Sequence, residues 1–276
     1  MSAFVTKLLA ASERNRSLLC VGLDPDPALM PREVTVADFN RSIIEATKDL
    51  VCAYKPNLAF YEALGFEGWQ ALRATLDAIP KHIPVIGDGK RGDVPNTAQA
   101  YAKAMFDVWG FDSTTVNPYL GMDTIDAFAA YKDKGVFLLC RTSNPGSGDF
   151  QGLPVPDPRE ASRLIPLYEH VALRMRVANI AGNFGLVVGV THPEELRRVR
   201  ELCPDMPILI LGVGPQGGDL ETAVRYGVDA HGRLAIINAS RQVLYASRGR
   251  DFAEAARRQA LALRDTMQAA LASKPA

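Results

Sequence analysis

The densest cluster of charged residues in the sequence runs from Gly87 to Val94 and carries the element Asp88-x-Lys90-x-x-Asp93. Residues two apart on an extended strand point to the same side, so Asp88 and Lys90 would place a carboxylate beside an ammonium. An isolated pair of this kind is often a structural salt bridge. Further charges on neighbouring segments favour a reactive array, because packing them around one cavity is costly unless a ligand or a reaction uses their field.

A second candidate site combines the glycine-rich segment 212–219 with Arg241. Glycines let backbone amides approach an anion, and an arginine offers two parallel donors to a phosphate. The same residues could instead form an ordinary turn and a surface arginine. Together with the charged cluster, they predict a phosphorylated small-molecule substrate.

Eight short runs rich in Val, Ile, Leu and Phe recur along the chain, at residues 18–23, 52–56, 84–87, 113–117, 136–141, 184–190, 207–213 and 234–239. Segments with helical spacing follow them, at residues 38–49, 61–78, 97–108, 124–132, 158–179, 193–201, 219–226 and 251–271. Strands that alternate with helices predict βαβ units and a parallel sheet. Eight units match a closed α/β (β/α)₈ TIM barrel better than an open sheet, since no Gly-rich dinucleotide turn follows the first run.

The chain is expected to form a single barrel domain over residues 1–276, because no Gly/Ser-rich linker divides it. Residues 1–17 predict an amphipathic helix before the first strand. Residues 142–157, rich in glycine and proline, form the longest segment expected to be irregular. A loop of this length inside a compact domain is usually functional, so it is expected to be a lid over the barrel mouth.

Polar residues end or follow most of the predicted strands. Barrels of this class hold their chemistry at the carboxyl ends of the strands, so these side chains should converge on one pocket. They are Asp24, Lys55, Asp88, Lys90, Asn117, Arg141, Ser143, Gln216 and Arg241.

Charge and composition exclude several classes of function. The 31 Lys and Arg balance the 31 Asp and Glu, which argues against a nucleic-acid binder and against a polybasic membrane anchor. No stretch approaches the roughly 18 apolar residues of a membrane span.

The four cysteines have no CxxC spacing and indicate buried thiols in a reducing, cytoplasmic compartment. The four histidines have no metal-ligand spacing, so no metal site is expected.

In seven segments the sequence resembles the orotidine 5′-phosphate decarboxylase family, in its longer bacterial form. The segments are Leu23–Asp26, Tyr54–Asn57, Asp88–Asp93, Val116–Gly121, Thr142–Ser147, Gly212–Gly218 and Ala239–Arg241. The resemblance implies conversion of orotidine 5′-monophosphate to uridine 5′-monophosphate and carbon dioxide, without a cofactor or metal. Lys90 would stabilise the carbanion and donate the proton.

The resemblance also implies a role for each matching residue. Asp88, Lys90 and Asp93 would form the charged catalytic array. Asp93 and Thr97 would be contributed across a homodimer interface. The expected substrate-binding residues are Asp24 and Lys55 for the ribose, Ser143 for the pyrimidine, and Gln216 and Arg241 for the phosphate.

Two alternatives remain open at this stage. A magnesium-dependent sugar-phosphate lyase or decarboxylase of the same barrel group shares the Asp-x-Lys-x-x-Asp element. A non-catalytic nucleotide sensor would need Gln216 and Arg241 but has no reason to keep Lys90 between two aspartates.

Overall fold

The computed structural model describes residues 2–214 and 219–273. Its central strands are β1 (Leu19–Leu23), β2 (Ala53–Pro56), β3 (Ile86–Arg91), β4 (Ser113–Val116), β5 (Gly135–Arg141), β8 (Phe184–Gly189), β9 (Ile208–Leu211) and β10 (Ala235–Ala239). They form one parallel sheet in the order β2-β1-β10-β9-β8-β5-β4-β3. Isolated parallel bridges, Tyr54 with Val85 and Asn57 with Asp88, join the two end strands. The sheet thereby closes into the predicted (β/α)₈ barrel.

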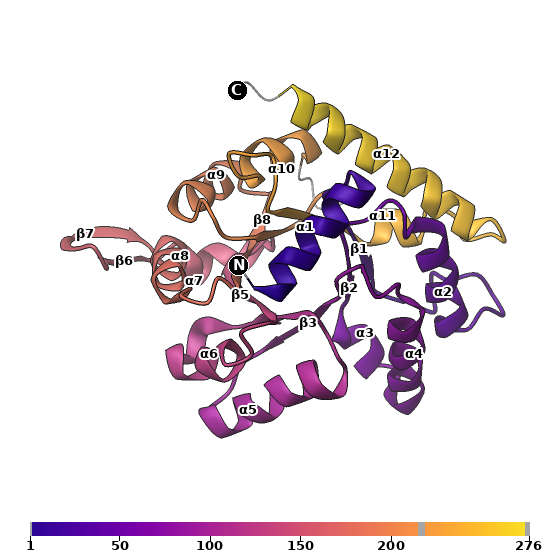
Figure 1. The fold of residues 1–276 in the computed structure, drawn as a ribbon, viewed down its shortest axis with the longest axis horizontal. Coiled ribbons are helices and arrows are strands. Elements are labelled where there is room, and N and C mark those ends of the chain that lie inside the picture. Colours follow the sequence, from indigo (N-terminus) through magenta and orange to yellow (C-terminus); the bar gives the residue numbers. More distant parts are fainter. Residues whose placement is uncertain (1, 215–218, 274–276) are drawn as a thin grey trace.

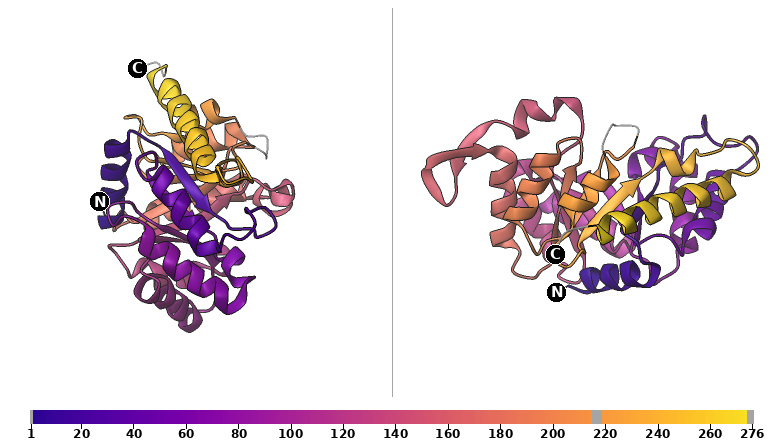
Figure 2. Two further views of the ribbon diagram at one scale, coloured as in Figure 1. Left: turned by 90° about the vertical axis from the view of Figure 1, so that its right-hand side faces the viewer. Right: turned by 90° about the horizontal axis from the view of Figure 1, so that it is seen from above.

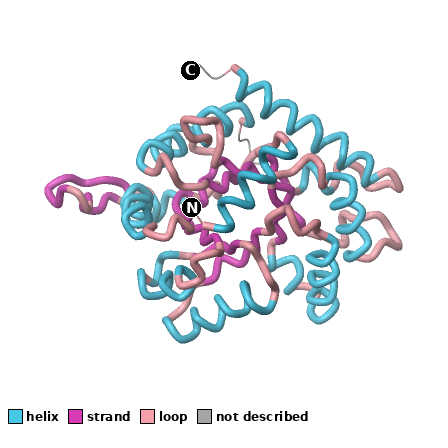
Figure 3. Tube along the Cα trace, in the orientation of Figure 1, coloured by secondary structure: helices cyan, strands magenta, loops and turns pink. Residues whose placement is uncertain are grey.

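Helices surround this ring of strands (Figure 1, Figure 3). They are α1 (Ala3–Asn15), α2 (Val36–Thr47), α3 (Leu58–Glu62), α4 (Gly65–Ala78), α5 (Pro95–Lys103), α6 (Met122–Ala129), α7 (Gly148–Gln151), α8 (Leu167–Ala178), α9 (Pro193–Leu202), α10 (Leu220–Gly227), α11 (Arg241–Leu244) and α12 (Phe252–Ala272). A π-helical turn, Ala104–Val108, continues α5. Among the described residues, none of these helices combines the length and apolarity that crossing a bilayer requires.

Side chains alternate between two layers along each barrel strand. Outward residues such as Val21 and Tyr54 pack against the helices in the larger apolar core. Inward residues at the lower end are apolar and form a second core: Cys20, Ala53, Ile86, Phe137, Val187, Leu209 and Ile236. The inward positions two residues further along β2 and β3 are Lys55 and Asp88. An apolar floor therefore lies directly beneath the charged mouth of the barrel.

The predicted N-terminal helix is present as α1, and it covers the amino end of the barrel. Phe4, Val5 and Leu8 belong to the inner apolar core. The ring of Phe4 meets that of Phe137 edge to face, at 5.7 Å between centroids. Gly135 makes room for it, because a Cβ there would lie 2.4 Å from the Phe4 ring. In Figure 1, α1 lies across the centre of the ring of strands.

The helix predicted over residues 158–179 is wrong in its first half. Strands β6 (Pro154–Asp157) and β7 (Glu160–Pro166) form an antiparallel hairpin, and α8 begins only at Leu167. Pro166 would remove a backbone donor from a helix interior, and the residue before a proline is biased towards extended conformations. The hairpin projects from the barrel (Figure 2).

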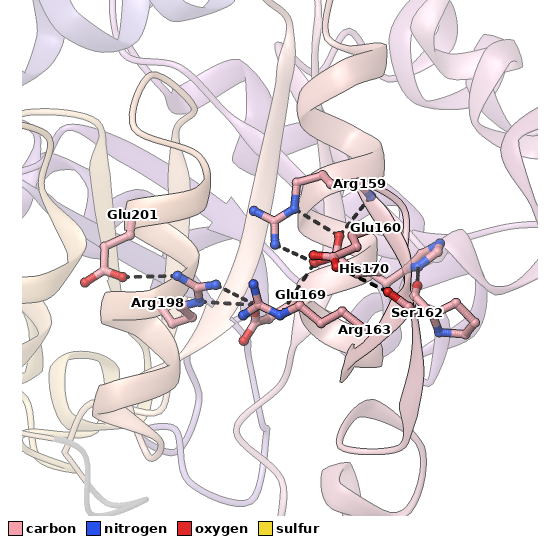
Figure 4. Close-up of polar contacts among 10 residues, drawn as sticks. Arg159, Glu160, Ser162, Arg163, Glu169, His170, Arg198 and Glu201 are labelled. Carbon is pink, nitrogen blue, oxygen red and sulfur yellow. Dashed lines mark hydrogen bonds and ion pairs between the residues drawn. The ribbon is translucent and has the colours of Figure 1, made fainter.

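Polar contacts hold the hairpin and its base. Asp157, which is buried, accepts hydrogen bonds from the backbone and the guanidinium of Arg159. The Nδ1 atom of His170, on α8, lies 3.0 Å from the Pro156 carbonyl. Figure 4 shows Ser162 against Glu160, and Arg198 of α9 between Glu169 and Glu201. These contacts explain how an exposed two-stranded hairpin stays ordered.

Two further predicted segments differ in detail. The helix expected over residues 61–78 is divided into α3 and α4, and Gly65 adopts a left-handed conformation at the junction. Residues 142–157 are not irregular throughout, because they contain a 3₁₀ turn (Pro145–Ser147), α7 and β6.

We predict that Phe4→Ala lowers the free energy of unfolding by about 3–5 kcal/mol, because it removes a ring that is 2% exposed from the barrel floor. Urea unfolding measures the change. Phe66→Ala is the matched control, since the Phe66 side chain is 75% exposed, and it should change stability by less than about 0.5 kcal/mol. Equal effects of the two variants would show that α1 does not seal the barrel.

Candidate active site

A pocket opens at the carboxyl ends of the barrel strands. Six of the nine predicted site residues line it: Asp24, Lys55, Asp88, Lys90, Ser143 and Arg241. They follow or end β1, β2, β3, β5 and β10, so the closure of the barrel brings together residues that are far apart in the chain. This is the end at which barrels of this class place their reactive groups.

The Asp88 carboxylate lies between two ammonium groups. Its Oδ2 atom is 2.8 Å from the Nζ atom of Lys55, and its Oδ1 atom is 2.7 Å from that of Lys90. The Asp88 and Lys55 side chains are each 3% exposed, whereas that of Lys90 is 39% exposed. Lys90 therefore presents a fixed positive charge to the pocket, while Asp88 and Lys55 lie buried beneath it and Asp88 binds its ammonium group.

The electrostatic field of this cluster keeps its buried members ionised. Burial alone would raise the pKa of Asp88, but the charges of Lys55 and Lys90 outweigh burial and hold that pKa well below its usual range. Burial alone would lower the pKa of Lys55, but the carboxylates of Asp88 and Asp24 reverse this and raise it. Asp88 is therefore an anion, and Lys55 a cation, at neutral pH.

An irregularity in β3 sets the position of Lys90. The register between β3 and β4 shifts between Gly87 and Arg91, and Lys90 has a φ of 46°. Such a conformation is uncommon for a residue other than glycine and needs support from its surroundings. Thr115 supplies it: its hydroxyl accepts from the Lys90 backbone N–H and donates to Asp88 Oδ1, both at 2.9 Å.

Thr115 is a residue that the sequence analysis missed. It lies on β4, and it pairs with the inward-facing Phe137 of β5. Because side chains alternate along a strand, the pattern of β4 could have indicated that Thr115 faces the inside of the barrel. The hydroxyl joins the backbone of Lys90 to the side chain of Asp88, so Thr115 is a positioning residue.

Asp93 and Thr97 do not line the pocket of their own chain. The Asp93 side chain accepts from the backbone N–H of Val94 at 2.7 Å, just before α5 begins. The Thr97 hydroxyl contacts Asn96 at 3.5 Å. Both residues follow β3, which carries Asp88 and Lys90, and neither is among the residues that line the cavity.

Gln216 lies outside the described residues. The glycines before it, Gly212 and Gly214, have φ values of 89° and 83°, a region that favours glycine. Gly212 lines the pocket, and Arg241 faces it from the first position of α11. Gly212 and Arg241 thus line the same pocket, whereas residues 215–218 of the glycine segment lie outside the described residues.

Arg141 and Asn117 do not reach the pocket, contrary to the expected convergence of polar residues. The register between β5 and β8 shifts between Leu139 and Arg141, and this bulge turns the guanidinium aside. Arg141 contacts Glu195 on α9 and Ser147 instead. The Asn117 side chain accepts from the backbone N–H of Tyr119 and caps a 3₁₀ turn.

Other pocket residues also escaped the sequence analysis. Tyr245 fixes the loop after β1, because its hydroxyl donates to the Asp24 carbonyl at 2.9 Å and accepts from the Asp26 backbone at 2.6 Å. Asn238 and Gln242 line the pocket, and each keeps one buried amide atom without a hydrogen-bond partner in the described part of the chain. Among the described residues, no group of three or more His, Cys, Asp and Glu is placed to hold a metal ion.

We predict that Asp88→Asn lowers the free energy of unfolding at pH 7 by about 3–5 kcal/mol, because it leaves the buried Lys55 charge without its anion. The folded-state pKa of Asp88 is depressed, so this contribution is present above the unfolded value near pH 4 and is lost as the pH falls towards the folded value. The difference in the free energy of unfolding between Asp88→Asn and the wild type should therefore become smaller below pH 4, as measured by urea titration.

Asp265→Asn is the control for this prediction. The Asp265 carboxylate also pairs with a cation, Arg264, but it is 60% exposed. Surface pairs contribute roughly 0–1 kcal/mol. An Asp88→Asn variant that is as stable as this control would show that the buried array does not stabilise the fold.

Comparison with known proteins shows that the chain matches one protein family over most of its length. Residues 17–258 match the model of the Orotidine 5′-phosphate decarboxylase / HUMPS family. An orotidine 5′-phosphate decarboxylase from Dehalococcoides mccartyi is 50% identical over 264 residues, which cover 96% of this chain and 97% of that protein.

Two solved structures from Leishmania donovani show the same fold. OMP decarboxylase aligns with a TM-score of 0.84 at 39% identity, over 99% of this chain and all of that one. UMP synthase aligns with a TM-score of 0.86 at 40% identity, and this chain spans 58% of its length. Through its barrel, its charged pocket and these matches, the chain belongs to the orotidine 5′-phosphate decarboxylase / HUMPS family.

Proposed function

We propose that this chain removes carbon dioxide from orotidine 5′-monophosphate to form uridine 5′-monophosphate, with Lys90 as the cation at the reacting carbon. Family membership and the half-identical relative support the activity, which makes the chain a carboxy-lyase of de novo pyrimidine synthesis. The observation that carries the mechanism is the Asp88 carboxylate between Lys55 and Lys90 in the pocket.

The chemistry needs a fixed cation next to the ring. When the bond to the carboxyl group breaks, its electron pair stays on the ring carbon in the plane of the pyrimidine, where the π-system cannot delocalise it. The Lys90 ammonium stabilises that charge and then transfers a proton to the carbon, so that a C–H bond replaces the C–C bond. Water returns a proton to the neutral Lys90 amine, which is partly exposed.

Asp88 and Thr115 act before the chemical step by holding Lys90 in place. Asp88 binds the ammonium at 2.7 Å, and Thr115 binds the Lys90 backbone. Because these contacts are made by the protein itself, little reorganisation is needed when charge develops on the ring. Asp88 also lies where the substrate carboxylate must enter.

The remaining pocket residues fit the three parts of a nucleotide. Asp24 and Lys55, at the ends of β1 and β2, are proposed to bind the ribose hydroxyls, and Ser143 the pyrimidine. Arg241 is proposed to bind the phosphate together with Gln216, beside the glycine segment. All but Gln216 line one cavity in the described residues, which supports a single nucleotide-binding site.

We also propose that residues 142–157 act as a lid. Arg141 contacts Ser147 and Gln151, and Gln151 Oε1 accepts from the Thr142 backbone at 2.8 Å. This network attaches the short α7 segment to the end of β5, two residues from Ser143. Phosphate binding at the other end of the pocket can then drive closure over the ring.

The first experiment follows the fall in ultraviolet absorbance when purified protein meets orotidine 5′-monophosphate in excess chelator. We expect rapid turnover by the wild type. Loss of activity with chelator would instead favour the magnesium-dependent alternative. Binding of uridine 5′-monophosphate without any turnover would favour a sensor.

Lys90→Ala should abolish turnover in this assay and leave binding of uridine 5′-monophosphate largely intact, because it removes the cation but not the phosphate and ribose contacts. Lys81→Ala is the control, since Lys81 is an exposed lysine in the turn that precedes β3. Near-normal decarboxylation by folded Lys90→Ala would remove Lys90 from the mechanism.

The positions of Asp93 and Thr97 support a homodimer in which each chain completes the site of its partner. Both follow β3, which carries Asp88 and Lys90, and neither lines the pocket of its own chain. Exposed apolar side chains lie next to Asp93 in the chain and on the loop after β4: Val94 is 53% exposed, and Tyr119 and Leu120 are 80% and 48% exposed. Exposed apolar side chains of this kind suit contact with a second copy of the chain.

Mixing two inactive variants tests this arrangement. In a hybrid of Asp93→Asn and Lys90→Ala chains, one site keeps its own Lys90 and receives Asp93 from the partner. Random exchange should restore about one quarter of wild-type activity, because half of the dimers are hybrids with one intact site of two. No recovery after proven subunit exchange would place Asp93 outside the partner's site.

The four cysteines are buried free thiols, which is compatible with the cytoplasmic location proposed from the sequence.

A further inference from the structure

The Gln242 side chain has an unpaired donor in the pocket. Its Nε2 atom is buried and has no hydrogen-bond partner in the described part of the chain. A buried donor without an acceptor costs about 1–3 kcal/mol, so such atoms are uncommon in folded proteins and require an explanation. Gln242 lines the pocket directly after Arg241, in the first turn of α11.

The residues around Gln242 indicate which part of a bound nucleotide would lie next to the Nε2 donor. A Cβ on Gly214 would lie 2.1 Å from Gln242 Oε1, so the amide occupies the space of the side chain that Gly214 lacks. Gly214 follows Gly212 and Val213, which also line the pocket. The Gln242 amide is therefore packed against Gly214, in the loop after β9, and Gln242 directly follows Arg241 in α11.

We infer that Gln242 is a further phosphate ligand, whose Nε2 atom donates a hydrogen bond to a phosphate oxygen of the bound nucleotide. The inference rests on the proposed function. A phosphate supplies only acceptors to this donor, and its binding gives the unpaired N–H a partner. Asn238 has the opposite character, because its unpaired atom is the acceptor Oδ1. Asn238 therefore suits a hydroxyl or a water, and not a phosphate.

The phosphate role differs from a purely structural role in its dependence on substrate. A side chain that only fills the space at Gly214 affects every substrate that uses the pocket. A phosphate ligand affects orotidine 5′-monophosphate and leaves orotidine, which lacks the phosphate, unchanged. Gln242→Met keeps the length and most of the packing volume and removes the donor, so it separates these roles.

We expect Gln242→Met to lower kcat/KM for orotidine 5′-monophosphate about tenfold, the typical effect of one hydrogen bond to a charged group, and to leave kcat/KM for orotidine within twofold. Gln242→Glu should lower kcat/KM for orotidine 5′-monophosphate further, because its carboxylate repels the phosphate. Gln259→Met, on the outer helix α12, is the matched control and should change neither value.

A binding measurement makes the test independent of turnover. The ratio of affinities for uridine 5′-monophosphate and uridine should fall about tenfold in Gln242→Met, with the folded state checked by thermal unfolding. An equal loss with both substrates, or no loss with either, would overturn the phosphate role of Gln242. Absence of turnover by the wild type would instead overturn the proposed function, and the affinity ratio would still report on Gln242.

Discussion

Two ammonium groups, those of Lys55 and Lys90, share the carboxylate of Asp88 at the mouth of the barrel. An isolated buried carboxylate would take up a proton, and an isolated buried ammonium would lose one. The two buried groups, Asp88 and Lys55, therefore stay charged because their partners are present. Removing Asp88 would affect more than one contact: it would take the anion from Lys55 and the orienting partner from Lys90.

The barrel makes this arrangement possible by separating two kinds of environment. Below the array, Phe4 and Phe137 seal an apolar floor that gives the charges little solvent on one side. Above it, the pocket is open, and Lys90 reaches solvent while Lys55 does not. Charges in such a setting interact more strongly than in water. The contacts that hold the array are made by the protein itself, and the apolar floor beneath it includes side chains of α1.

The parts of the molecule that follow strict periodicity could be predicted from the sequence. Apolar runs that alternate with helical segments predicted the eight strands. Alternation along one run placed Asp88 beside Lys90, and the position of Lys55 at the end of its run placed Lys55 at the pocket. The predictions failed where the backbone departs from regularity. A bulge turns Arg141 away from the pocket, Pro166 delays α8, and the left-handed Lys90 depends on Thr115, which is distant in sequence. No local pattern reports a bulge or an unpaired amide such as that of Gln242, because both depend on contacts between segments that are distant in sequence.

The residues proposed for binding and those proposed for chemistry come from two different sides of the barrel mouth. The charged array comes from β2 and β3, whereas Arg241, Gln242 and the glycine segment come from the β9 and β10 side. A substrate that carries both a phosphate and a carboxylated ring must therefore span the pocket. In the proposed function, contacts at the phosphate end would not touch the reacting bond, yet they would hold the ring against Lys90 and oppose the repulsion from Asp88. Binding energy from the phosphate would then be available to the transition state, because Asp88 and Thr115 hold Lys90 in position through contacts within the protein.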